Sequence, residues 1–307
     1  MWTLSVCIPI YNSDVRSLVD TLCAQIEQFK LNQINIVLVD DASEDQYKLL
    51  LNFNHQAVQC HLLTENIGRS KIRNAFLKYT TSTHLLFIDG DSCVKNSDFL
   101  LAYKRYLDQN PNCKVLVGAS CYDHNPPPTN QRLRWKYSSK RESLTFDERK
   151  RDTQHGFKTN NFVIERELLI ENPFDERLNG YGHEDTLFGF QLFKKGIQID
   201  QIDNPVWNLN LDTNEIFLMK TDEALRNLLW ISINFELLGL ETASPLLRIY
   251  KRLKTFGITR LILRMLYWKS PLLKSLLQTG KAPLFIFDFY RLGRLWYLDK
   301  NTQNKIS

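Results

Sequence analysis

Two carboxylates separated by one glycine follow directly after a short apolar run. The run occupies residues 85–88, and Asp89, Gly90 and Asp91 come next. A bulky run of this length predicts a buried strand of a parallel sheet, and such sheets bind ligands at the carboxyl ends of their strands. Carboxylates in that place suit a hard divalent cation held against a phosphate. The alternative is an ordinary polar exit from a strand, because Asp-Gly is common in turns.

A second carboxylate pair, Glu184 and Asp185, follows Gly180 and Gly182 and opens an apolar helical pattern. One of the two could act as a general base toward an acceptor hydroxyl. Adjacent carboxylates at a helix N-terminus are also good caps, so the pair alone decides little. Its occurrence downstream of the Asp-Gly-Asp turn favours the catalytic interpretation.

Basic residues gather in two segments. Arg69, Lys71 and Arg73 open a predicted helix, where guanidinium groups and the helix N-terminus favour a phosphate; the alternative is a solvated helix face. Residues 122–153 carry eight Lys or Arg residues. They are predicted to form a mobile loop or an irregular helix over the site, with a solvated surface excursion as the alternative.

The elements that must position these groups alternate between strand and helix. A strand at residues 4–8 ends at Pro9, apolar residues recur at helical spacing over 15–29, and a second strand covers 34–39. This rhythm predicts a parallel α/β unit. The turn after the first strand contains no glycine, which argues against a nicotinamide-binding dehydrogenase. Further strands are predicted near 61–63, 114–118 and 160–164, with a helix over 99–107.

Composition sets broad limits. The 307 residues are 43% hydrophobic and 24% charged, with a net charge of +5, which is ordinary for a globular protein and gives no reason to expect a nucleic-acid partner. The six cysteines form no C-x-x-C pair. Without a secretory signal, this predicts reduced thiols and a cytoplasmic protein.

Five short motifs follow one another along the chain: Ser5-Val6-Cys7-Ile8-Pro9-Ile10-Tyr11-Asn12, Val39-Asp40-Asp41-Ala42-Ser43, Asn66-Ile67-Gly68 with Arg73-Asn74, Asp89-Gly90-Asp91, and Gly182-His183-Glu184-Asp185. With them, roughly residues 3–220 resemble a family 2 glycosyltransferase of the GT-A type. The resemblance implies an α/β fold, with a Rossmann-like mixed sheet flanked by helices. It places the catalytic domain at residues 1–220 and a C-terminal α-helical region at 221–307.

The resemblance also assigns a nucleotide pocket to residues at the strand ends. Pro9 and Tyr11 would line it, and Asp41 would accept a hydrogen bond from the base, usually uracil. Asn66 and Arg73 would hold the base or the phosphates.

The remaining roles concern the cation and the transfer. Asp89 and Asp91 resemble the D-x-D element, in which Mn²⁺ or Mg²⁺ bridges the diphosphate and stabilises the charge on the leaving group. Asp185 resembles the catalytic base, and Glu184 its neighbour in the acceptor site. The implied reaction is an inverting transfer from a nucleotide sugar, UDP-linked, to a hydroxyl of a glycan or lipid-linked acceptor in cell-surface polysaccharide biosynthesis.

One departure from the family pattern concerns the metal. Many relatives carry a histidine as a further ligand shortly after a segment like Asp203-Asn204-Pro205, whereas here Asn208-Leu209-Asn210 follows and His183 is the last histidine. An asparagine oxygen can ligate a hard cation, but more weakly than the usual ligand. The alternative interpretation is a non-catalytic nucleotide-sugar-binding or scaffold protein with a degenerate metal site.

The C-terminal region mixes basic with apolar and aromatic residues, most clearly over 246–254 and 260–269. Basic amphipathic helices can lie on anionic membranes, which would place the enzyme at the inner face of the cell membrane. The same faces could instead pack on the catalytic domain or form a homodimer, and the sequence leaves these readings open.

Overall fold

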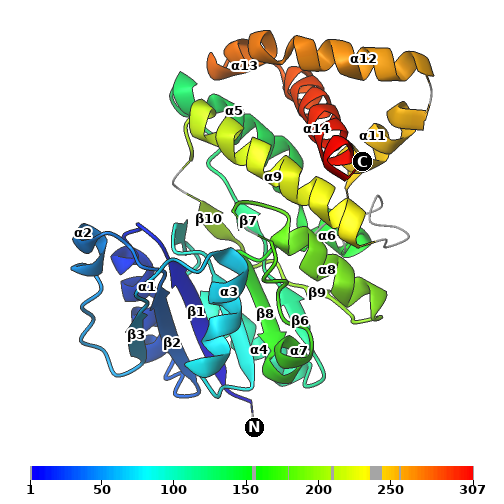
Figure 1. Ribbon diagram of the computed structural model, residues 1–307. Helices are drawn as coiled ribbons and strands as arrows, with labels where there is room; N and C mark the ends of the chain where they lie inside the picture. Colours follow the sequence, from blue (N-terminus) through cyan, green and yellow to red (C-terminus); the bar gives the residue numbers. More distant parts are fainter. Residues whose placement is uncertain are drawn as a thin grey trace. The chain divides into compact units, whose positions relative to one another are not determined.

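The computed structural model describes residues 2–153, 157–178, 180–208, 211–235, 244–255 and 257–306 (Figure 1). The chain divides into two compact units that interleave along the sequence. The sheet unit comprises Met1–Asp123, Ser143–Arg177 and Gln191–Asn210, and the helical unit comprises His124–Glu142, Leu178–Phe190 and Leu211–Ser307. The predicted boundary at residue 220 lies inside a continuous helix, α9 (Asn214–Asn234), and an independent domain at 1–220 stays a prediction.

In the described part of the sheet unit, seven strands form one sheet in the order β3-β2-β1-β4-β8-β6-β9 (Figure 1). Their bounds are β1 Leu4–Ile10, β2 Ile34–Asp40, β3 Val58–Leu62, β4 His84–Ile88, β6 Val115–Val117, β8 Asn161–Glu165 and β9 Asp200–Gln201. Among these strands, β8 runs antiparallel to both β4 and β6, while the other pairings are parallel. The predicted mixed sheet is therefore confirmed.

The first strand is longer than the sequence predicts. β1 pairs with β2 through Pro9 to Ile10, although it pairs with β4 only as far as Cys7. Proline lacks the N–H group that donates to a neighbouring strand. The pairing of β1 with β4 ends before Pro9, whereas its pairing with β2 continues. The strand thus carries Pro9 to the carboxyl edge of the sheet.

Helices cover the sheet with the apolar positions that their spacing predicts. α1 (Arg16–Gln28) buries Leu18, Val19, Leu22 and Ile26, and α4 (Phe99–Gln109) buries Phe99, Leu100, Tyr103 and Leu107. These side chains join those of β1, β2 and β4 in one core. The other helices of this unit are α2 (Asp45–Lys48), α3 (Arg69–Ala75), η1 (Phe76–Lys78), α6 (Phe146–Arg151) and α7 (Arg166–Glu171).

The basic segment at residues 122–153 is largely helical, as one of the two sequence predictions has it. It contains η2 (Thr129–Gln131), α5 (Arg132–Tyr137), the π-helical turn η3 (Ser138–Glu142) and α6. The surface-excursion reading fails, because Leu133 and Arg149 are buried. The Arg149 guanidinium donates to Gln201 Oε1 at 2.5 Å and to the carbonyls of Val117 and Ile202, so α6 is anchored to the ends of β6 and β9.

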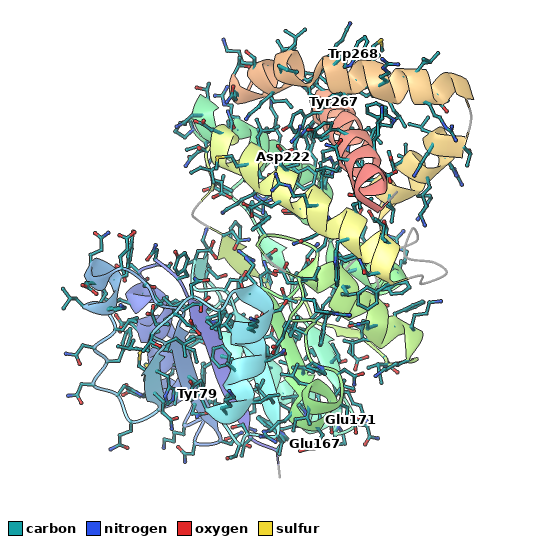
Figure 2. All side chains as sticks on the ribbon, viewed as in Figure 1. Tyr79, Glu167, Glu171, Asp222, Tyr267 and Trp268 are labelled. Carbon is teal, nitrogen blue, oxygen red and sulfur yellow. The ribbon has the colours of Figure 1, made fainter. Side chains whose placement is uncertain are left out.

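The helical unit consists of α9 with α11 (Pro245–Thr255), α12 (Gly257–Trp268), α13 (Ser270–Gln278) and α14 (Leu284–Ile306), together with α5 and the start of α8 (Glu184–Lys194). α14 packs against α9, α12 and α13 (Figure 1). Asp222, labelled on α9 in Figure 2, accepts hydrogen bonds from Tyr290 and Arg294 of α14. Within the described residues, no helix is long and apolar enough to span a bilayer.

Candidate active site

The Asp-Gly-Asp motif forms a tight turn at the carboxyl end of β4. The Ser92 N–H donates to the Asp89 carbonyl at 3.0 Å, and the Ser13 hydroxyl donates to the Gly90 carbonyl at 3.3 Å. A Cβ at Gly90 would lie 3.1 Å from both the Pro9 carbonyl and Val15 Cγ1. The glycine therefore lets the turn pack closely against the end of β1.

An ion pair from the neighbouring helix orients the first carboxylate. Arg73 of α3 is 2% exposed, and its Nη2 lies 2.9 Å from Asp89 Oδ1. Its Nη1 donates to the Arg69 carbonyl. The sequence assigned Arg73 to the base or phosphates, and that role stays a prediction. In the structure, Arg73 contacts Asp89 and the Arg69 carbonyl. The Asp89 side chain is 26% exposed, and Asp91 is exposed.

The Asp41 carboxylate holds the turn that precedes α3. It accepts hydrogen bonds from the backbone N–H groups of Ile67 (2.7 Å) and Gly68 (3.1 Å), while Asn66 Nδ2 donates to the Asp41 carbonyl (3.1 Å). Burial raises the pKa of Asp41, and the two backbone hydrogen bonds offset part of that effect. The structure thus brings Asp41 and Asn66 together, as a shared base pocket requires.

The ends of β1 and β2 are fastened to one another beside this turn. The Asn12 N–H donates to Ser43 Oγ at 2.8 Å, and Asn12 Oδ1 accepts from the Glu44 N–H at 2.8 Å. Pro9 is half-buried and Tyr11 is 57% exposed. Because β2, β1 and β4 are neighbours in that order, the predicted nucleotide residues share one edge of the sheet.

A small second sheet brings Asn208 next to the Asp-Gly-Asp turn. β10 (Val206–Asn208) pairs with β5 (Ser92–Cys93) and β7 (Ser120–Cys121), and Asn208 is in register with Ser92. Asn208 therefore stands beside the residue that follows Asp91. Leu209 and Asn210 lie outside the described residues.

The donor set here suits a cation that is shared with a ligand. In the parts of the chain that the structure describes, no three His, Cys, Asp or Glu side chains gather into a metal-binding group. Mg²⁺ is commonly held by one or two carboxylates together with substrate phosphates. Asp89 and Asp91 fit that pattern, with hard oxygen ligands at an accessible turn.

The second carboxylate pair lies at the start of α8, in the helical unit. Gly180, Gly182 and His183 have positive φ values of 73°, 94° and 68°, so the chain makes a sharp loop before the helix. Asp185 Oδ1 accepts a hydrogen bond from the Thr186 N–H at 2.7 Å, and Glu184 is buried. As expected from successive helical positions, the two carboxylates have different surroundings.

Side chains of α9 hold this loop in place. Asn227 Nδ2 donates to the carbonyls of Gly182 (3.0 Å) and Tyr181 (3.3 Å), and Glu223 Oε2 accepts from the Tyr181 N–H (3.2 Å). A Cβ at Gly182 would come within 2.7 Å of Ala224 Cβ. Sequence reasoning missed these three α9 positions. Their signal, polar and small residues on one helix face, is visible only once the facing loop is known.

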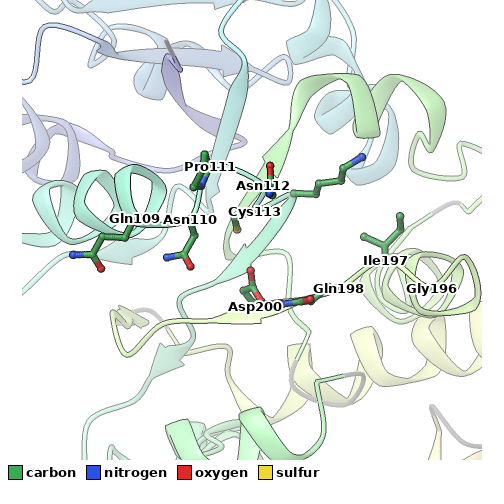
Figure 3. Close-up of a pocket in the computed structure, with 10 residues that line it drawn as sticks. Gln109, Asn110, Pro111, Asn112, Cys113, Gly196, Ile197, Gln198 and Asp200 are labelled. Atoms are coloured by element: carbon green, nitrogen blue, oxygen red, sulfur yellow. Dashed lines mark hydrogen bonds between the residues drawn. The ribbon is translucent and has the colours of Figure 1, made fainter.

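A cavity of about 490 Å³ lies at the other edge of the same sheet (Figure 3). It is lined by residues before β6 and at the start of β9, among them Cys113 and Asp200. Because β6 and β4 are both antiparallel to β8, their amino ends share the edge opposite Asp89. Burial, followed by the Asp200 charge, raises the pKa of Cys113 to about 12. The thiol stays protonated at neutral pH, and we assign the cavity no part in the candidate site.

Comparison with known proteins identifies the family. The family described as Glycosyl transferase family 2 matches residues 5–171, more than half of the chain. The chain belongs to glycosyl transferase family 2. The matched range includes Asp41, Arg73 and the Asp-Gly-Asp turn, but it ends before Glu184.

One curated relative is poly(ribitol-phosphate) beta-N-acetylglucosaminyltransferase TarS of Staphylococcus aureus, to which the chain is 29% identical over 126 residues. That match covers 38% of this chain and 21% of TarS, so the chain matches about a fifth of the relative's length.

Similar solved structures of glycosyltransferases confirm the GT-A fold. The crystal structure of S. aureus TarS 1–349 matches with a TM-score of 0.52 at 19% identity, over 99% of this chain and 92% of that one. Mannosyltransferase PcManGT of Pyrobaculum calidifontis matches with a TM-score of 0.60 at 14% identity, over 99% and 87%. At these identities, the likeness bears on the fold alone.

Proposed function

We propose that this family 2 glycosyltransferase transfers a sugar from a nucleotide sugar, UDP-linked, to a hydroxyl of a glycan or lipid-linked acceptor, with inversion at the anomeric carbon. The observation that carries the proposal is the Asp89–Asp91 turn, oriented by the buried Arg73 at the carboxyl edge of the sheet. That edge is where open α/β sheets bind nucleotides.

The donor class is supported by the ligands of solved relatives. TarS 1–349 has been solved with UDP and with UDP-GlcNAc, and PcManGT with GDP-Man and Mn²⁺. We assign the base to the pocket of Pro9, Tyr11, Asp41 and Asn66. The Asp41 carboxylate is held in place by hydrogen bonds from the backbone N–H groups of Ile67 and Gly68.

A divalent cation, Mn²⁺ or Mg²⁺, fits Asp89 and Asp91 as its protein ligands, with Asn208 standing nearby. When bound, it would stabilise the negative charge that develops on the departing diphosphate. Arg73 orients Asp89, because its buried guanidinium lies 2.9 Å from one oxygen of that carboxylate.

Asp185 is the proposed general base, which accepts the proton of the acceptor hydroxyl as the oxygen attacks the anomeric carbon. Its Oδ1 accepts hydrogen bonds from the N–H and the hydroxyl of Thr186, which orient the carboxylate. Glu184, more buried, is the proposed neighbour that shapes the acceptor site.

For the cellular setting, we propose cell-surface polysaccharide biosynthesis by a cytoplasmic enzyme at the inner face of the membrane. TarS, by its name, transfers N-acetylglucosamine to poly(ribitol-phosphate), a polymeric acceptor. No nucleic-acid partner is proposed, and a homodimer remains a separate reading of the C-terminal helices.

The second candidate is a non-catalytic nucleotide-sugar binder with a degenerate metal site. It is favoured by one observation, the absence of any histidine after His183. Under this reading UDP binds, but the sugar is not transferred.

A donor screen separates the two candidates. The purified chain is incubated with a panel of UDP- and GDP-sugars, with and without Mn²⁺, and release of the nucleoside diphosphate is measured. The enzyme should release UDP from one donor in a Mn²⁺-dependent way. UDP binding without release from any donor would favour the non-catalytic binder, and the absence of both would contradict both candidates.

A further inference from the structure

Positive charge is concentrated in one part of the helical unit. Residues 244–287 contain nine Lys or Arg residues and no Asp or Glu, whereas the whole chain has a net charge of only +5. This segment includes α11, α12 and α13. A local charge of this size attracts an anionic partner even though the protein as a whole is mildly basic.

The α12 and α13 helices have two apolar faces. The inner face contributes Leu263, Leu266, Leu273 and Leu277 to the packing of the helical unit. Tyr267 stacks on Tyr297 of α14 at 4.5 Å between ring centroids, and Gly293 of α14 lies so close to α12 that a Cβ would come within 2.7 Å of the Leu266 backbone. One face of the α12 and α13 pair is therefore buried by packing within the helical unit.

The outer face is apolar but exposed. Its members are spaced at helical intervals along α12 and α13: Leu261, Met265, Trp268, Leu272 and Leu276. We call them the outer stripe. Leu261 is 65% exposed and Trp268 is 67% exposed. Figure 2 shows Tyr267 directed toward α14 and Trp268 directed away from it. Isolated exposed apolar residues are ordinary, whereas a row of five marks a contact surface.

Basic side chains border the outer stripe. At 100° per residue, Arg264 and Lys269 fall on its two sides, and both are exposed. The Arg264 guanidinium lies 4.7 Å from the centre of the Trp268 ring. Aromatic and leucine side chains flanked by Lys and Arg are the composition of helices that lie in the interface of an anionic membrane.

We propose that the outer stripe of α12 and α13 docks this protein on an anionic lipid bilayer. Leu261, Met265 and Trp268 would enter the boundary between head groups and acyl chains, while Arg264 and Lys269 contact lipid phosphates. A second copy of the chain suits this face less well, because it would bring two borders of like charge together. This surface would hold the protein at the membrane location proposed above. Docking there requires no transferase activity.

Vesicle binding of the full chain tests it. The protein is mixed with vesicles of phosphatidylcholine alone or with phosphatidylglycerol, at low and high salt, and the bound fraction is measured by sedimentation. We expect binding to the anionic vesicles that weakens with salt. Each basic residue near the surface contributes about fivefold in affinity, so Arg264→Glu with Lys269→Glu should weaken binding at least about 25-fold.

Matched variants make the test specific. Leu261→Glu with Trp268→Glu should abolish binding, whereas Leu49→Glu and Lys78→Glu, at exposed positions of the sheet unit, should leave it unchanged. Quenching of tryptophan fluorescence by brominated lipid should largely disappear in Trp268→Phe. A thermal unfolding curve checks that each variant is folded.

Three results would overturn the proposal: equal binding to neutral and anionic vesicles, unchanged binding of Leu261→Glu with Trp268→Glu, or unchanged quenching in Trp268→Phe. If that double variant instead converts a dimer to a monomer by light scattering while vesicle affinity stays the same, the stripe is a subunit interface. The UDP-release assay is read separately, so failure here leaves the transferase proposal standing.

Discussion

The two carboxylate pairs of this chain are held in different ways. Asp89 and Asp91 stand on a turn fixed by the end of a buried strand, by backbone hydrogen bonds and by Arg73. Glu184 and Asp185 open α8 after a loop with three positive φ values, and that loop depends on side chains of another helix.

The two settings differ in how firmly they position a carboxylate. A turn that leaves a fully buried strand takes its position from the sheet, so its carboxylates are ready to share a cation with a diphosphate. The loop before α8 takes its position from side chains of α9, among them Glu223 and Asn227. We therefore expect the first pair to tolerate distant substitutions better than the second.

The largest effect should come from the second pair. Asp185→Asn keeps the size of the side chain but cannot accept the acceptor proton, so turnover should fall by about 10²–10⁴-fold. UDP affinity should be unchanged, because the proposed nucleotide residues lie at the carboxyl ends of β1, β2 and β4, in the turn before α3 and on α3 itself. Steady-state kinetics and calorimetry measure the two quantities.

Glu184→Gln is the matched control for that variant. It removes the adjacent charge and should lower turnover much less than Asp185→Asn does. Near-normal turnover of Asp185→Asn with an identified acceptor would show that Asp185 is not the base.

A smaller effect is expected where α9 holds the loop. Asn227→Ala removes the donor to the Tyr181 and Gly182 carbonyls, so kcat should fall roughly tenfold through misplacement of Asp185, with UDP affinity unchanged. Asn234→Ala, on the same helix but bonded to the Trp230 carbonyl, should have no effect on kcat. Equal kinetics for Asn227→Ala and the wild type would remove the positioning role.

The smallest expected effect is an increase in Mn²⁺ affinity. Asn208 is in register with Ser92, and a histidine there would add a stronger ligand beside Asp91. Asn208→His should lower the Mn²⁺ concentration that half-saturates UDP binding by several-fold, with little change in metal-free affinity. A half-saturating concentration that stays the same would place Asn208 outside the cation's reach.

Local pattern was enough to predict β1, β2, β4, β6 and β8, the α1 and α4 faces and the Asp-Gly-Asp turn. It placed β3 a few residues late, and it predicted neither β9 nor the short strands of the second sheet. Burial against the sheet explains the apolar run before Asp89. It also explains the helical spacing of Leu18, Leu22 and Ile26, which join the same core. The antiparallel course of β8 was not predictable, because an apolar strand carries no sign of its direction. Membership of residues 124–142 in the helical unit likewise depends on long-range contacts.

The site shows the same limit. The sequence predicts that Arg73 binds a phosphate. Its burial and its ion pair with Asp89 depend on how α3 packs, which the sequence does not show. Glu223 and Asn227 act on a loop some forty residues earlier, and their partners cannot be inferred from helix pattern alone. Roles at ligands remain predictions for Pro9, Tyr11, Asp41 and Asn66.

The most direct test of the central claim is calorimetric titration of UDP into the wild type, Asp91→Asn and Asp185→Asn, each with and without Mn²⁺. The wild type and Asp185→Asn should bind UDP more tightly with Mn²⁺, and Asp91→Asn should lose at least about tenfold of that metal-dependent affinity while it stays folded. The same Mn²⁺-dependent affinity in Asp91→Asn as in the wild type would contradict the assignment of the Asp-Gly-Asp turn to the cation and the diphosphate.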